Sequence, residues 1–191
     1  MTDAKPKLMI VIASTRPGRI GQPMSEWFET RVAAHGGFDV DVADLQAIDL
    51  PMMDEPNHPR LKDYVHQHTK DWSARVDAAD AFVFVHPEYN YGMTAPLKNA
   101  LDYLHAEWAY KPVGLVSYGG VSAGLRAAQM IKQVVTTLKM TPVVEAVSVP
   151  FVAQFVGDDG EIVANEVREK AADAMLTEIA RYVEALKPLR A

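Results

Sequence analysis

Residues 8–23 read Leu-Met-Ile-Val-Ile-Ala-Ser-Thr-Arg-Pro-Gly-Arg-Ile-Gly-Gln-Pro. The first six residues are apolar and rich in β-branched side chains, which predicts a strand buried on both faces. The polar, glycine-containing segment after them predicts a turn, and Pro23 stands where a helix would begin. A buried strand that leads through a short loop into a helix is typical of a parallel α/β sheet.

The rest of the chain repeats this alternation. Further apolar runs of strand length occupy residues 38–45, 81–85, 113–117 and 143–149. Segments with helical spacing lie at 24–31, 97–104, 125–138 and 167–186. Strands that alternate with helices predict a parallel sheet covered on both faces. The run 38–45 alternates apolar side chains with aspartates, which indicates an edge strand. Residues 49–59 hold three prolines and predict an irregular connection.

Composition excludes several classes of protein. The 191 residues, 49% of them hydrophobic and 23% charged, are expected to form one soluble domain, residues 1–191. The chain has no Cys, so thiol chemistry is excluded and redox chemistry would need a bound cofactor. The net charge of −6 argues against nucleic acid and anionic membranes as partners. The apolar run after Lys5 and Lys7 is shorter than a signal-peptide core, and no other run spans a membrane, so a cytoplasmic location is expected.

The loop after the first strand has the chemistry of a phosphate site. Ser14, Thr15, Arg16 and Arg19 offer hydroxyl and guanidinium groups immediately before a helix N-terminus. An ordinary solvated turn is the alternative. The segment matches neither the Walker pattern nor the dinucleotide G-x-G-x-x-G pattern, which favours a single phosphate.

Two later loops follow strands in the same way. His86-Pro-Glu-Tyr-Asn-Tyr-Gly92 offers two tyrosines that could flank a planar ring and a glycine that lets the main chain approach closely. Ser117-Tyr-Gly-Gly120 precedes another helix and predicts close approach of backbone to a ligand. Ligands of open parallel sheets bind at the carboxyl ends of the strands, where these loops would meet. Ordinary aromatic or helix-entry loops are the alternatives.

Three other functions are disfavoured. Gly120-Val-Ser-Ala-Gly124 matches the nucleophile elbow of hydrolases, but all six His precede Ser122, so the usual triad order fails. His66 and His68 would point to different faces of a helix, which argues against a metal site. A phosphorylated receiver domain needs clustered acids, whereas the first and third strands end in Ser14 and His86-Pro87.

Together the three loops resemble those of the NADPH-dependent FMN reductase family, which includes flavin, quinone, azo and chromate reductases. The resemblance is carried by Ser14-Thr-Arg-Pro-Gly-Arg19, Pro87-Glu-Tyr-Asn-Tyr-Gly92 and Ser117-Tyr-Gly-Gly120. It implies a flavodoxin-like three-layer α/β fold with a five-stranded parallel sheet in the order 2-1-3-4-5. It also implies FMN as cofactor and NADPH or NADH as electron donor.

The resemblance implies a role for each loop. The FMN phosphate would be held by Ser14, Arg16, Arg19, Ile20 and Gly21. The isoalloxazine and ribityl chain would be lined by Pro87, Glu88, Tyr89, Asn90 and Tyr91. The other edge of the ring would be closed by Ser117, Tyr118, Gly119 and Gly120. No side chain is assigned as an essential acid or base, because the flavin performs the difficult chemistry.

The resemblance further implies ping-pong transfer of two electrons to a flavin, quinone, azo compound or similar small acceptor. A homodimer or homotetramer is expected, with Trp108 and Tyr110 as interface or core aromatics. The alternative function is a flavin-bound redox sensor or partner-regulating protein in which reductase turnover is incidental.

Overall fold

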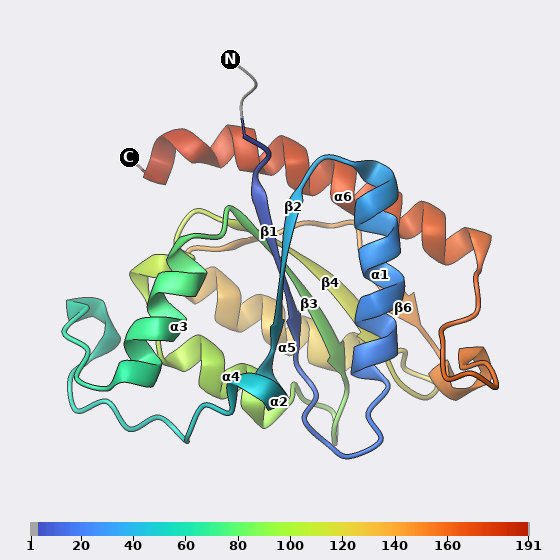
Figure 1. The fold of residues 1–191 in the computed structure, drawn as a ribbon, viewed down its shortest axis with the longest axis horizontal. Coiled ribbons are helices and arrows are strands. Elements are labelled where there is room, and N and C mark those ends of the chain that lie inside the picture. Colours follow the sequence, from blue (N-terminus) through green and yellow to red (C-terminus); the bar gives the residue numbers. More distant parts are fainter. Residues whose placement is uncertain (1–3, 191) are drawn as a thin grey trace.

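A computed structural model describes residues 4–190 (Figure 1). The helices and strands, in chain order, are β1 (Lys7–Ile12), α1 (Gly21–His35), β2 (Asp39–Asp44), α2 (Leu45–Ile48), α3 (Gln67–Asp77), β3 (Ala81–Pro87), α4 (Ala95–Asp102), β4 (Pro112–Tyr118), α5 (Leu125–Thr137), β5 (Thr141–Pro142), β6 (Val147–Val149) and α6 (Glu166–Leu186). Short 3-10 helices occupy Pro59–Leu61, Ala106–Trp108, Val152–Phe155 and Lys187–Arg190. The ends of the expected domain, residues 1–3 and 191, lie outside the described residues.

The sheet has the order β2-β1-β3-β4-β5, and every pair of neighbouring strands is parallel. The predicted flavodoxin-like α/β fold is confirmed. The β2 strand lies at the edge, as its alternation predicted, and its side chains are mostly half-buried or exposed. In contrast, all seven residues of β3 and of β4 are buried, as central strands of a sheet covered on both faces should be.

The fifth strand differs from the prediction. A continuous strand over 143–149 was expected, but two short strands, β5 and β6, share the position beside β4. Pro142 pairs with Val113 and Val147 pairs with Val116, so five steps of the outer chain lie opposite three steps of β4. Val144, in this extra length, is 83% exposed. The chain therefore leaves the sheet and returns to it.

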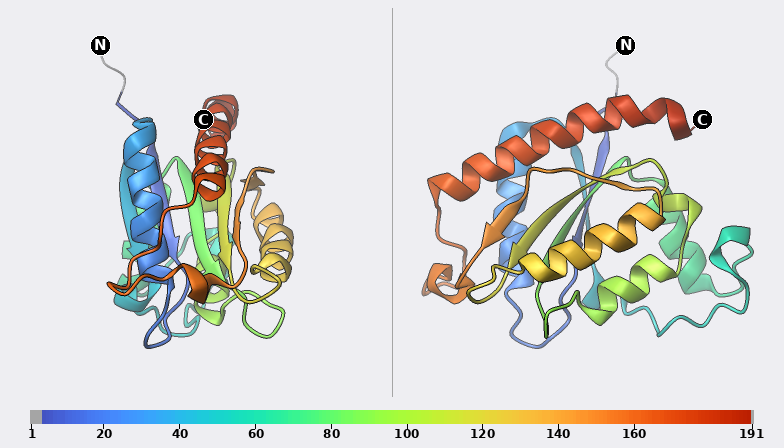
Figure 2. Two further views of the ribbon diagram at one scale, coloured as in Figure 1. Left: turned by 90° about the vertical axis from the view of Figure 1, so that its right-hand side faces the viewer. Right: turned by 180° about the vertical axis from the view of Figure 1, so that it is seen from behind.

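Helices cover both faces of the sheet and make two cores (Figure 2). On one face, Trp72 of α3, Leu101 of α4 and Ile131 of α5 pack against Phe82 and Phe84 of β3. On the other face, residues of α1 and α6 pack against the alternate positions of β1, β3 and β4. Trp108 is 1% exposed and belongs to the first core.

The helix α3 was not predicted, because its buried side chains are only Thr69, Trp72 and Val76 within a polar segment. Residues 49–58 contain no helix or strand, as their prolines predicted. In Figure 1 the loops that follow β1 and β3 meet at the lower edge of the sheet, where the carboxyl ends of these two strands lie. This edge is where the sequence places its three candidate loops.

Candidate functional site

The loop between β1 and α1 presents unbonded backbone donors. The N–H of Arg19 donates to the carbonyl of Arg16 at 3.1 Å, which closes a turn. Within residues 4–190, the N–H groups of Thr15, Arg16, Gly18 and Ile20 find no hydrogen-bond partner. Helix α1 begins after Ile20 without a side-chain cap. An uncapped helix start beside free N–H groups fits a phosphate group.

The two arginines of this loop are placed differently. Arg16 is exposed, has no polar side-chain partner among residues 4–190, and lies with its guanidinium carbon 6.0 Å from the ring centroid of Tyr89. Arg19 is largely buried and donates to both carboxylate oxygens of Asp44 at 2.5 Å. It also donates to the carbonyl of Ser14 at 2.7 Å. The free charge of the loop is therefore that of Arg16.

Ser14, Gly21 and Tyr118 pack beneath the loop. Ser14 is 1% exposed, and the Tyr118 hydroxyl donates to its Oγ at 3.2 Å. A Cβ at Gly21 would stand 2.2 Å from Ser14 Oγ and 2.9 Å from the Tyr118 oxygen, so no larger residue fits without movement. Burial raises the pKa of Tyr118 to about 12, which keeps the phenol protonated as a donor. Its hydroxyl thus points to the loop between β1 and α1 and supports it.

The loop after β3 forms a tight turn over residues 89–92. The N–H of Tyr89 donates to the Gly92 carbonyl at 3.1 Å, and the N–H of Gly92 donates to the Tyr89 carbonyl at 2.9 Å. Asn90 and Tyr91 have positive φ angles of 48° and 73°. A tyrosine in left-handed backbone is unfavourable unless its surroundings hold it there. The turn exposes Tyr91 by 72% and Tyr89 by 37%.

Glu88 and Arg126 hold this turn against the start of α5. The Glu88 side chain is 5% exposed and accepts from the backbone N–H of Arg126 at 3.0 Å and from its Nε at 2.5 Å. Hydrogen bonds from Arg126 and Ser122 keep the pKa of Glu88 below its usual value despite the opposing effect of burial. The Arg126 guanidinium carbon lies 3.7 Å from the Tyr91 ring centroid, a close cation–π contact. The Glu88 carboxylate is therefore committed to protein contacts.

The loop after β4 approaches the same edge with its backbone. Ser117 is 1% exposed, and its hydroxyl faces the Val147 carbonyl and Ser148 of β6. Gly119 bonds the backbone of Val149 and Val152, whereas a Cβ at Gly120 would meet no atom within 4 Å. Gly120 and Val121 are both exposed, so the main chain at Gly120 is accessible. Pro87 is buried at the end of β3 and fixes the direction in which the loop after β3 leaves the sheet.

All fourteen predicted residues lie at or just beyond the carboxyl ends of β1, β3 and β4. The backbone or side-chain surface that faces outward belongs to Arg16, Tyr89, Asn90, Tyr91 and Gly120. Three positioning residues were missed by the sequence reasoning: Asp44, Arg126 and Thr94, whose hydroxyl donates to the Ala13 carbonyl at 2.7 Å. The aspartate one residue before the end of the predicted second strand, 38–45, was a usable signal for Asp44, since parallel strands end at one edge.

A cavity of about 400 Å³ adjoins the loop between β1 and α1. Its lining includes Thr15, Met52, Pro96 and Asn99. Asn99 holds the preceding irregular segment by accepting from the Met53 N–H at 2.9 Å and donating to the Pro51 carbonyl at 2.7 Å. The irregular segment therefore forms a wall beside the loop.

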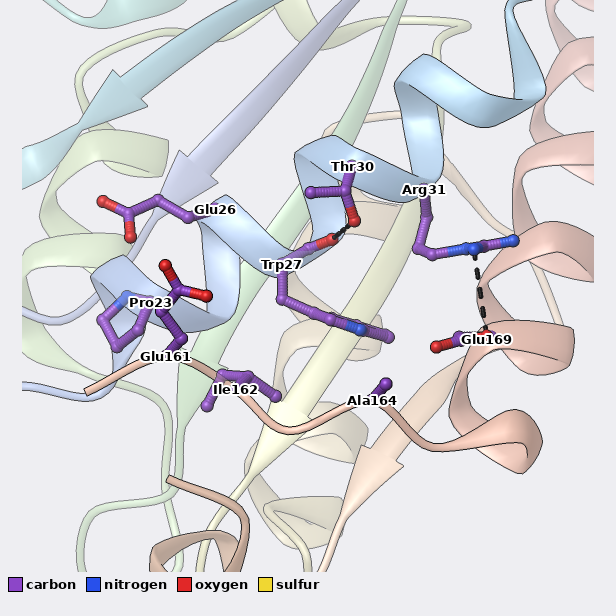
Figure 3. Close-up of a pocket in the computed structure, with 9 residues that line it drawn as sticks. All are labelled: Pro23, Glu26, Trp27, Thr30, Arg31, Glu161, Ile162, Ala164 and Glu169. Carbon is purple, nitrogen blue, oxygen red and sulfur yellow. Dashed lines mark hydrogen bonds and ion pairs between the residues drawn. The ribbon is translucent and has the colours of Figure 1, made fainter. Parts of the chain in front are cut away.

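A second cavity, of about 300 Å³, lies between α1 and the segment that precedes α6. Figure 3 shows the Trp27 indole, Ile162 and the ion pair of Arg31 with Glu169 around it. None of the fourteen predicted residues lines this cavity. It is separate from the candidate site.

His66 and His68 do not point to different faces, as a continuous helix would require. His66 precedes α3 as its N-cap, and the two rings stack with centroids 5.2 Å apart. Both face Asp54, whose carboxylate lies 2.9 Å from His68 Nε2 and 4.0 Å from His66 Nε2. In residues 4–190 no three His, Cys, Asp or Glu side chains are arranged to hold a metal ion. Nor does any helix in that range have the length and apolar content to cross a membrane.

Comparisons with known proteins identify the family of the chain. The sequence model of the NADPH-dependent FMN reductase family matches residues 6–154. A Schizosaccharomyces pombe protein named NAD(P)H-dependent FMN reductase is 40% identical over 149 residues, which cover 76% of this chain and 74% of that protein. A Staphylococcus haemolyticus protein named FMN-dependent NADPH-azoreductase is 30% identical over 115 residues, covering 60% and 61% of the two chains.

The fold is also that of a solved structure. FerB of Paracoccus denitrificans, a flavoenzyme NAD(P)H:(acceptor) oxidoreductase, superposes with a TM-score of 0.74 and 17% identity over 95% of this chain and 98% of that chain. At this identity the likeness concerns the fold alone. Because the family model covers most of the sequence, the chain belongs to the NADPH-dependent FMN reductase family.

Proposed function

We propose that this protein passes two electrons from NAD(P)H to a small electrophilic acceptor, a flavin, quinone or azo compound, in a ping-pong sequence. The oxidoreductase class, FMN as cofactor and NAD(P)H as donor follow from membership of the family. Bound FMN would supply the chemistry, taking up hydride from NAD(P)H and releasing two electrons to the acceptor after the oxidised nucleotide has left. The protein would bind and orient the reactants.

One observation carries the proposal. Among residues 4–190, the start of α1 has no side-chain cap, the N–H groups before it have no hydrogen-bond partner, and the guanidinium of Arg16, also without a polar partner, lies above Tyr89. These donors suit a dianionic phosphate next to a flat aromatic group. We therefore assign the phosphate to the loop of Ser14, Arg16, Arg19, Ile20 and Gly21, and the ring and ribityl chain to the loop of Pro87, Glu88, Tyr89, Asn90 and Tyr91.

The remaining predicted residues have supporting positions in this proposal. Gly119 and Gly120 would bring main chain to the ring edge, while Ser117 and Tyr118 support that loop from beneath. The cavity beside Thr15 and Met52 would admit the acceptor. We further propose one domain, a homodimer or homotetramer, and a cytoplasmic location, with no nucleic-acid or membrane partner.

The test is reconstitution with FMN, followed by anaerobic mixing with NADPH or NADH. The expected result is stoichiometric binding and loss of the oxidised-flavin absorbance before any acceptor is added. An acceptor added afterwards should restore the absorbance, and initial rates should give parallel double-reciprocal lines. Protein that fails to bind FMN would overturn the proposal, and reduction that requires the acceptor to be present would overturn the ping-pong order.

Arg16→Ala tests the position of the phosphate. Loss of a charge-assisted hydrogen bond should weaken FMN binding about ten- to a hundredfold. Arg181→Ala is the matched control, because Arg181 is an exposed arginine of α6, away from the three loops. Equal FMN affinity in both variants would place the phosphate elsewhere.

A further inference from the structure

Arg19 is the most constrained cation of the phosphate loop. Its side chain is 8% exposed, and its two terminal nitrogens reach both oxygens of Asp44 at 2.5 Å. One of them also reaches the Ser14 carbonyl at 2.7 Å. A guanidinium bound to a carboxylate by two parallel hydrogen bonds is held in a fixed orientation.

Asp44 connects this arginine to the edge of the sheet. It is the last residue of β2 and the N-cap of α2, where its carboxylate accepts from the Gln46 N–H at 3.0 Å. The hydrogen bonds from Arg19 hold the pKa of Asp44 below its usual value. The carboxylate is thus charged at neutral pH and cancels the charge of Arg19. Through Arg19, the loop after β1 is tied to the end of β2.

Arg16 lacks any such partner among residues 4–190 and is exposed above Tyr89. Its charge is the one that an incoming anion would meet. Two arginines three positions apart therefore have different surroundings, one neutralised and rigid, the other free.

We propose that Arg19 is a positioning residue, which with Asp44 fixes the shape of the loop, and that Arg16 supplies the charge that binds the phosphate. This inference rests on the proposed site and assigns different roles to two arginines that the family resemblance places together at the FMN phosphate. Arg19 and Asp44 together carry no net charge. A pair of neutral side chains that still form a hydrogen bond at these two positions should therefore preserve FMN binding. Any neutral residue in place of Arg16 should weaken FMN binding.

The experiment measures FMN dissociation constants by flavin fluorescence at several salt concentrations. Arg19→Gln alone should weaken FMN binding about tenfold or more, because it leaves the Asp44 carboxylate unpaired beside the phosphate. Adding Asp44→Asn, which restores a neutral pair, should return the affinity to within about threefold of the parent protein and keep its salt dependence. Arg16→Gln should weaken binding and flatten the salt dependence.

The matched control is Arg16→Gln combined with both Arg19→Gln and Asp44→Asn, which should stay close to Arg16→Gln because replacing the whole pair leaves the net charge of the loop unchanged. Arg19→Lys is a second probe: it keeps the charge but lacks the planar fork that binds both Asp44 oxygens and the Ser14 carbonyl in one fixed orientation, so it should weaken binding. A double variant of Arg19 and Asp44 that stays as weak as Arg19→Gln, or an Arg19→Lys variant that binds like the parent, would overturn the inference. Absence of FMN binding by the parent protein would instead overturn the proposed function.

Discussion

The Tyr118 hydroxyl donates to the Ser14 Oγ at 3.2 Å and so joins the end of β4 to the loop after β1, which lie 104 residues apart in the chain. Both residues are nearly fully buried. The hydrogen bond passes beneath the candidate phosphate site and crosses the position of β3. A tyrosine at the end of β4 thus supports the loop that contains Ser14.

Tyr118→Phe removes this donor and leaves the ring in place. We expect the unfolding free energy to fall by about 1–3 kcal/mol, because the buried hydroxyl of Ser14 is left without its partner. Urea denaturation of the flavin-free protein measures this. The paired Tyr118→Phe and Ser14→Ala substitutions should cost less together than the sum of the two; strict additivity would argue that the hydrogen bond contributes nothing.

Gly21→Ala should destabilise the protein and weaken FMN binding, because the new Cβ would stand 2.2 Å from Ser14 Oγ. Overpacking of this kind typically costs about 1–3 kcal/mol. Gly120→Ala is the control, since its Cβ would meet no atom within 4 Å, and it should leave the melting temperature almost unchanged. Equal melting temperatures for the two variants would contradict the close packing at Gly21.

His86 should make the protein sensitive to acid. It is 0% exposed, and burial lowers its pKa from 6.5 to about 4. The His86 imidazole therefore binds a proton below about pH 6.5 in the unfolded chain, but only below about pH 4 in the folded chain. The contribution of His86 to the free energy of unfolding should be fully present above pH 6.5. On acidification below pH 6.5 it should fall by up to about 1.4 kcal/mol per pH unit.

The measurement is unfolding free energy between pH 7 and pH 4 for the parent and for His86→Gln. Other groups titrate in both proteins, so the difference between the two curves isolates His86. The variant should lose less stability over this interval. Parallel curves would show that His86 does not resist protonation in the folded state.

Glu88→Ala should loosen the start of α5. Gly124, the N-cap of this helix, provides no side-chain hydrogen bond, and the Glu88 carboxylate accepts from the Arg126 N–H in its place. Loss of such a cap costs about 0.5–2 kcal/mol. Arg126→Ala is the comparison, because it keeps the backbone hydrogen bond and should cost less. Hydrogen exchange of the first turn of α5 should rise in Glu88→Ala only.

Much of the fold followed from periodicity. Apolar runs long enough for strands, separated by segments of helical spacing, predicted a parallel sheet and the edge position of β2, whereas the strand order was implied by the family resemblance. The interruption between β5 and β6 was not predicted, because Val143, Val144 and Val147 are the same residue type. Only the pairing with β4 shows that Val147 belongs to a strand and that Val144 does not. The helix α3 escaped because its few buried residues are set among polar ones.

The sequence by itself determined which loops carry the candidate site, because residue type limits chemistry. Glycine lets the main chain approach a ligand closely, and arginine and hydroxyl side chains suit the binding of an anion. Only the tertiary structure decided how each residue is used. Arg16 and Arg19 are the same residue type, yet Asp44 pairs with Arg19, whereas Arg16 has no ion-pair partner in the described part of the chain. Likewise Glu88 is committed to Arg126 and the Tyr118 hydroxyl to Ser14. The partners that make these differences come from distant segments, and folding brings them together at the edge of the sheet.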